Sequence, residues 1–106
     1  MMGGLLSSNS SDSEVILALK QQDRLVIDCR SGGEFSRGDG FTGAINIPVD
    51  SLEGRLSEIE PKDRTILTYC AGGVRSARAA DILKAHGYSR VFSTTNAGHI
   101  RALLSS

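Results

Sequence analysis

The sequence has no net charge, no long hydrophobic run and very little cysteine. Twelve basic and twelve acidic residues cancel, so no overall field attracts nucleic acid or an anionic membrane, and any anion-binding site must be local. No apolar run approaches the ~20 residues that a membrane span needs. We therefore expect no nucleic-acid partner and no membrane association.

The two cysteines, Cys29 and Cys70, are too few for a disulfide scaffold and lack the spacing of metal ligands. We therefore expect no metal and a reducing compartment, the cytoplasm. Residues 1–15, MMGGLLSSNSSDSEV, contain no basic n-region and no long apolar h-region, so they are not expected to act as a signal peptide. A periplasmic location stays open if an export signal has been removed.

A regular alternation of apolar segments and helical patterns dominates the rest of the chain. The Gly- and Ser-rich residues 1–11 are expected to be flexible, and residues 12–106 to form one domain. The alternation predicts an α/β fold with a mostly parallel sheet and helices on both faces. Strands are expected within 24–29, 44–48, 64–70 and 89–93. Helices are expected within 11–22, 50–60, 75–87 and 97–104, with one more helical turn near residues 34–35.

Cys70 ends the third predicted strand, where functional crevices of parallel sheets lie. Two glycines follow it, and a helix is expected from Arg75 or Ser76. A thiol is a good nucleophile only as a thiolate, and helix N-termini lower the cysteine pKa. The free N–H groups of residues 71–75 are expected to curl around the sulfur, with Gly72 and Gly73 allowing the backbone angles this needs. The alternative is a buried cysteine that only packs.

Four segments of the chain resemble single-domain rhodaneses, which are thiosulfate sulfurtransferase-like modules. These are VIDCRSGGEF, GAINIP, YCAGGVRSARAADIL and LKAHGYSRVF, in the expected order within residues 12–104. Two segments depart from the family pattern: DGFTGA lacks the usual histidine, and NAGHIRALL lacks the usual tryptophan. We expect these departures to alter the pocket wall and leave the nucleophile in place.

The resemblance implies a sulfur transfer through a persulfide on Cys70, with no organic cofactor and no metal. Thiosulfate or a persulfide would be the donor, and a thiol, a partner-protein thiol or cyanide the acceptor. Arg75 would attract the anionic donor, and we favour a monomer. The residues implied for substrate binding are Ala71, Gly72, Gly73, Val74 and Arg75.

Two other functions remain open at this point. One is a cysteine phosphatase or arsenate reductase, but those enzymes use a Cys-x5-Arg loop, and Cys70 and Arg75 form the shorter Cys-x4-Arg. The other is a non-catalytic rhodanese-like module that binds a partner or senses sulfur. Cys29 is expected to be a packed core thiol, and Asp28 and Arg30 to form a structural ion pair.

Overall fold

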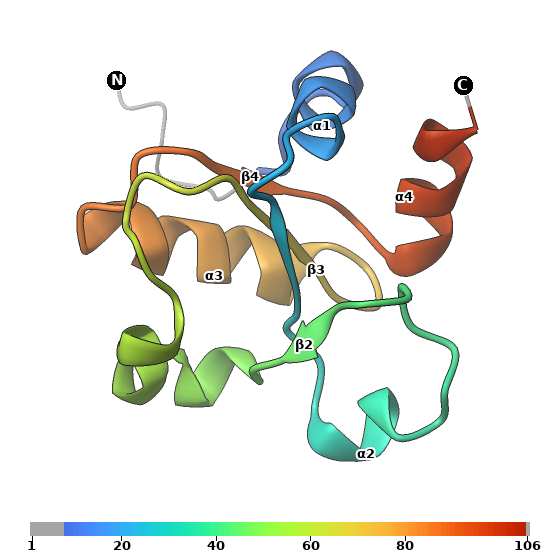
Figure 1. Ribbon diagram of the computed structural model, residues 1–106. Coiled ribbons are helices and arrows are strands. Elements are labelled where there is room, and N and C mark those ends of the chain that lie inside the picture. Colours follow the sequence, from blue (N-terminus) through green and yellow to red (C-terminus); the bar gives the residue numbers. More distant parts are fainter. Residues whose placement is uncertain (1–7, 106) are drawn as a thin grey trace.

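The computed structural model describes residues 8–105, and these form an α/β domain on a four-stranded sheet (Figure 1). The strands lie in the order β2–β1–β3–β4, and every neighbouring pair is parallel. Their bounds are β1 Leu25–Asp28, β2 Ile45–Asn46, β3 Ile66–Tyr69 and β4 Val91–Ser93. The helical elements are α1 Asp12–Leu19, α2 Gly32–Phe35, η1 Val49–Glu58, α3 Val74–Ala85 and α4 Ala97–Leu104.

The sheet has helices on both faces, as the sequence predicted. On one face, Ile27 and Ile66 pack with side chains of η1 and α3. On the other face, their neighbours Val26 and Leu67 pack with side chains of α1 and α4. Successive strand residues point to opposite faces, so a strand between two helical layers must be apolar throughout. All four residues of β3 are accordingly 0% exposed.

The element expected at 50–60 differs from its prediction. It is a 3-10 helix over Val49–Glu58, and the backbone leaves the helical region at Arg55, where φ is −126°. Neither Asp50 nor Ser51 caps it, because the cap position is Pro48 and no side chain bonds there. Gly54 and several other weak helix formers explain why this amphipathic pattern does not give a regular α-helix. Leu52 and Ile59 are nevertheless buried.

The beginning of the domain is fixed by local hydrogen bonds. Ser11 caps α1 in a capping box with Glu14. Ser10 runs beside β4, and its backbone N–H donates to the Ser93 carbonyl over 2.9 Å. Of residues 1–11, which are expected to be flexible, residues 1–7 lie outside the described residues. In residues 8–105, no helix combines the length and apolar character needed to cross a membrane.

Candidate active site

Cys70 lies at the carboxyl edge of the sheet, between β3 and α3. It is 2% exposed and directly precedes a tight turn. Gly73 ends that turn in the left-handed region, with φ at 99°. A Cβ added at Gly73 would lie 3.4 Å from the Thr95 backbone and 2.5 Å from the Asn9 side chain. Gly73 is therefore required by its φ and by close packing, whereas Gly72 has no positive φ, contrary to the prediction.

Backbone and side-chain groups of the α3 N-terminus surround the sulfur. The Gly73 N–H donates to Cys70 Sγ over 3.0 Å, and the Ser76 N–H over 3.4 Å. Ser76 Oγ lies 3.5 Å from the same sulfur. Within the described residues, the N–H groups of Ala71, Val74 and Arg75 make no such bond. Fewer of the N–H groups of residues 71–75 contact the sulfur than predicted, and Ser76, which lies outside that range, is one of the donors.

The exposure of the residues around the loop shows which side chains can enclose the sulfur. Val74 is 80% exposed and Ala71 is also exposed, so neither side chain encloses the sulfur. Ser76 is completely buried, and its hydroxyl also lies 2.6 Å from the Thr94 carbonyl oxygen. Ser76 is not among the predicted binding residues; the one signal that could have identified it is its position in the first turn of the expected helix, where N–H groups are free.

The surroundings of Cys70 favour its thiolate. Burial raises the pKa of the Cys70 thiol, but hydrogen bonds from Ser76, Gly72 and Gly73 together outweigh burial and hold this pKa below its ordinary value. Cys29 lies in the same core, without comparable donors. Burial, together with the nearby charges of Cys70 and Asp28, raises the pKa of Cys29 to about 12. Both cysteines are free, and Cys29 is the packed core thiol that was predicted.

We expect iodoacetamide to alkylate Cys70 and to leave Cys29 unmodified. The labelling rate should rise with pH to a midpoint below the ordinary cysteine value of about 8.5, because the folded state stabilises the thiolate. Peptide mass spectrometry after timed labelling measures both effects. Labelling of Cys29 first in the native protein would contradict this assignment.

Arg75 is paired with a carboxylate at the mouth of the loop. Its Nη1 lies 2.6 Å from Glu34 Oε1, and its Nη2 lies 3.1 Å from Glu34 Oε2. Glu34 also forms a capping box with Ser31 at the start of α2. The Arg75 guanidinium and the Ser31 bonds lower the pKa of Glu34 to about 2. The ion pair therefore persists through the neutral range, and it joins α2 to the Cys70 loop.

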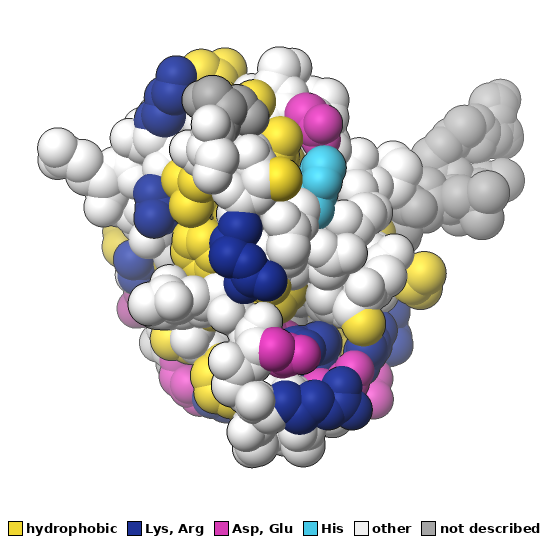
Figure 2. Space-filling view, turned by 90° about the vertical axis from the view of Figure 1, so that its right-hand side faces the viewer, with side chains coloured by type: hydrophobic (Ala, Val, Ile, Leu, Met, Phe, Trp, Pro, Cys, Tyr) yellow, Lys and Arg dark blue, Asp and Glu magenta, His cyan; other side chains and the backbone are white. Residues whose placement is uncertain are grey.

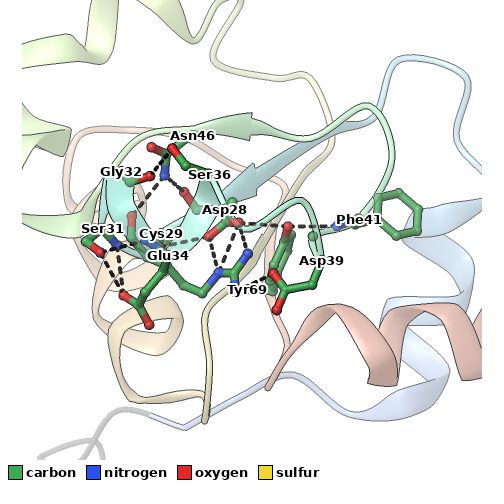
Figure 3. Close-up of polar contacts among 12 residues, drawn as sticks. Asp28, Cys29, Ser31, Gly32, Glu34, Ser36, Asp39, Phe41, Asn46 and Tyr69 are labelled. Atoms are coloured by element: carbon green, nitrogen blue, oxygen red, sulfur yellow. Dashed lines mark hydrogen bonds and ion pairs between the residues drawn. The ribbon is translucent and has the colours of Figure 1, made fainter.

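A buried polar network fixes the segment between β1 and β2 (Figure 3). The Asp28 carboxylate accepts hydrogen bonds from Arg30 Nε and Nη2 and from the Tyr69 hydroxyl. Tyr69 in turn accepts from the Phe41 N–H over 2.9 Å. Arg30 Nη1 also bonds to Asp39 over 3.1 Å. The predicted ion pair is thus present, and through Tyr69 the network ties the loop to β3, which ends just before Cys70.

Gly40 shows why the corner beside this network has no side chain. A Cβ added there would lie 2.7 Å from the Tyr69 hydroxyl oxygen. The bonds among Tyr69, Asp28 and Arg30 occupy the space. His99 and Arg78 make contacts at the surface: His99 bonds to Asp12, and Arg78 bonds to Asp50.

An open hollow of about 320 Å³ adjoins the Cys70 loop. Ala71 and Tyr69, which flank Cys70, line it on one side. Side chains from α2, the following loop and α4 complete it. Figure 2 shows the face of the molecule that carries α2 and α4, where basic and acidic side chains gather close together. Within the described residues, no group of three or more metal-ligating side chains occurs.

Comparisons with known proteins agree with this fold. Residues 11–98 match the family model for the rhodanese-like domain. A sulfurtransferase from Allochromatium vinosum is 38% identical over 72 residues, which cover 68% of this chain and 65% of that protein. A tRNA uridine(34) hydroxylase from Cronobacter sakazakii is 32% identical over 85 residues, which cover 76% of this chain and 24% of that protein. The chain therefore matches only part of each relative.

Solved structures also resemble this one. A rhodanese-like domain protein from Staphylococcus aureus superposes with a TM-score of 0.66 at 27% identity, over 77% of this chain and 78% of that one. An NAD-dependent persulfide reductase from A. fulgidus superposes with a TM-score of 0.60 at 33% identity, over 76% of this chain and 14% of that one.

Proposed function

Because this chain belongs to the rhodanese-like domain family, we propose that it is a sulfurtransferase that carries sulfur as a persulfide on Cys70. The donor is thiosulfate or a persulfide, and the acceptor is a thiol. One observation supports this most strongly: the Cys70 sulfur accepts hydrogen bonds from the backbone N–H groups of Gly73 and Ser76. Fixed donors of this kind stabilise a negatively charged sulfur without reorganisation, at roughly 3 kcal/mol per well-placed donor in a transition state.

The reaction has two steps, and neither needs an added oxidant. The Cys70 thiolate attacks the outer sulfur of thiosulfate, a bond forms between the two sulfurs, and sulfite leaves with the electron pair of the broken bond. An acceptor thiolate then attacks the outer sulfur of the Cys70 persulfide. The Cys70 thiolate leaves, and the acceptor departs as a persulfide. We propose a cytoplasmic location, since both cysteines are free thiols.

The size of the loop supports sulfur transfer over phosphate or arsenate chemistry. Four residues, 71–74, separate Cys70 from Arg75. The oxyanion-binding Cys-x5-Arg loop has five residues between its cysteine and its arginine. Here Gly73 and Ser76 already contact the sulfur itself, with the N–H groups at 3.0 and 3.4 Å. A cradle filled by one sulfur atom suits a persulfide better than a tetrahedral group with several oxygens.

Intact-protein mass spectrometry after incubation with thiosulfate tests the proposal. The protein should gain one sulfur, roughly 32 Da, and lose it again when a thiol acceptor is added. A folded protein that gains no sulfur from thiosulfate or from a persulfide donor would contradict the proposal. Phosphate-ester and arsenate assays would then be the next comparison.

Arg75→Ala should raise the KM for thiosulfate, because the guanidinium interacts electrostatically with Cys70 and would attract the anionic donor. Glu34→Gln should lower this KM, since it removes the carboxylate that competes with the donor for Arg75. Both side chains are partly exposed, so each effect should be about twofold to fivefold. Steady-state kinetics with thiosulfate as the varied substrate measures them.

Arg78→Ala is the matched control for these kinetics. Arg78 lies one turn further along α3, is exposed and pairs with Asp50, so its loss should leave the KM for thiosulfate unchanged. An unchanged KM in Arg75→Ala would show that Arg75 serves only to hold α2 through Glu34.

A further inference from the structure

The hollow beside Cys70 has two walls that belong to different parts of the chain. One wall carries Glu34, which belongs to α2, and Arg37, which lies two residues beyond the end of α2. The other wall carries Asn96, which directly precedes α4, and Arg101 from the middle of α4. Ala71, the residue after the nucleophile, lies between them. At about 320 Å³ the space is at the lower end of the range for small-molecule sites.

The acidic groups in this hollow are already paired, and two of its basic groups are not. Glu34 is bonded to Arg75 over 2.6 Å, and Asp39 to Arg30 over 3.1 Å. Within residues 8–105, neither Arg37 nor Arg101 forms an ion pair with a carboxylate. Arg101 Nη1 makes one long bond, 3.4 Å, to the Gly40 carbonyl oxygen. The hollow thus presents two guanidinium groups with free donors.

The start of α4 adds to this positive character. Asn96 caps the helix by accepting from the His99 N–H over 2.8 Å. The first N–H groups of the helix, at Ala97 and Gly98, have no acceptor inside it, as at any helix N-terminus, and both residues line the hollow. Two unpaired arginines and these N–H groups favour an anion here, although the whole chain has no net charge.

We propose that this hollow is the acceptor subsite, and that it takes a small thiol carrying carboxylate groups. The carboxylates bind Arg37 and Arg101, and the thiol reaches the Cys70 persulfide past Ala71. This inference rests on the proposed sulfur transfer. The acceptor binds Arg37 and Arg101, whereas the donor binds Arg75. A thiol with no negative charge gains nothing from this subsite.

The chemical step at this subsite is balanced without a further reactant. The acceptor thiolate attacks the outer sulfur of the persulfide and forms a new sulfur–sulfur bond. The bond from that sulfur to Cys70 Sγ breaks, and its electron pair stays on Cys70 as the thiolate. The hydrogen bonds from Gly73 and Ser76 are present to stabilise that leaving thiolate.

The test measures discharge of the preformed persulfide by two thiols, mercaptosuccinate with two carboxylates and 2-mercaptoethanol with none. Protein is first charged with thiosulfate, and the gain of sulfur is checked by mass. The second-order rate constant for discharge is then measured for each thiol in wild type and in the double variant Arg37→Gln/Arg101→Gln. The rate constant for mercaptosuccinate divided by that for 2-mercaptoethanol should be about fivefold to tenfold lower in the double variant than in wild type.

Arg90→Gln is the matched control, because it removes the same charge from an exposed arginine at the opposite edge of the sheet, just before β4. It should leave the ratio unchanged. The uncharged thiol, measured on the same preparation, reports whether a variant is folded and active. An unchanged ratio in the double variant, or an equal change in Arg90→Gln, would overturn the acceptor subsite while leaving the sulfurtransferase proposal intact. Failure of wild type to charge would overturn both.

Discussion

Cys70→Ala is expected to abolish the gain of sulfur from thiosulfate, while Cys29→Ala retains it. The two cysteines are a matched pair, since both are buried in one core cluster, at 2% and 1% exposure. Each substitution removes one sulfur atom from the core and should cost a similar amount of stability. Only Cys70 has the Gly73 and Ser76 N–H groups directed at its sulfur, so only its loss should remove the nucleophile.

Intact mass and thermal unfolding, measured on the same samples, separate chemistry from folding. The expected result is two variants with similar melting temperatures, of which one gains roughly 32 Da and the other does not. Sulfur gain by a folded Cys70→Ala protein would show that the persulfide forms elsewhere. Loss of sulfur gain in a folded Cys29→Ala protein would give Cys29 a role in the transfer that its raised pKa argues against.

Asp28→Ala is expected to cause the largest loss of stability among single substitutions near the site. The Asp28 side chain is 0% exposed, and its partner Arg30 is 8% exposed. Removing the carboxylate leaves a buried guanidinium without its main partner, a change that typically costs about 3–5 kcal/mol. The Tyr69 hydroxyl, which donates to Asp28, loses its acceptor as well. The free energy of unfolding should therefore fall by several kcal/mol.

Urea unfolding of Asp28→Ala, with Asp50→Ala beside it, measures this effect. Asp50 also pairs with an arginine, but the side chains of Asp50 and Arg78 are 85% and 63% exposed, so that variant should lose less than about 1 kcal/mol. Equal losses in the two variants would mean that the buried network contributes no more than a surface ion pair. Asp39 and bulk water would then have to satisfy Arg30 in the variant.

Much of the fold could be predicted because its signals are local. Each central strand is a short apolar run rich in β-branched residues, and its burial on both faces follows from that run alone. The helix over Ala97–Leu104 has the predicted position. The position of Cys70 at the carboxyl edge of the sheet follows from the same pattern, since it directly succeeds β3.

The contacts that sequence reasoning missed join distant parts of the chain. Glu34 and Arg75 are 41 residues apart, as are Asp28 and Tyr69, and no local pattern identifies such partners. Arg75 could be assigned to the mouth of the loop, but its carboxylate partner could not. Ser76 was passed over because its role depends on the turn at Gly73, which brings its N–H back to the sulfur. The spacing of Cys70, Gly73 and Ser76 in the sequence does not by itself specify the geometry of this turn.

The cradle around Cys70 is built from main-chain donors, and this affects which amino-acid substitutions the loop can accept during evolution. Every residue except proline supplies an N–H group, so most substitutions at exposed loop positions such as Val74 leave the donors in place. In this loop Cys70 is required for its sulfur and Gly73 for its backbone angle. The loop surface can therefore diversify while the N–H groups around the Cys70 sulfur are inherited unchanged.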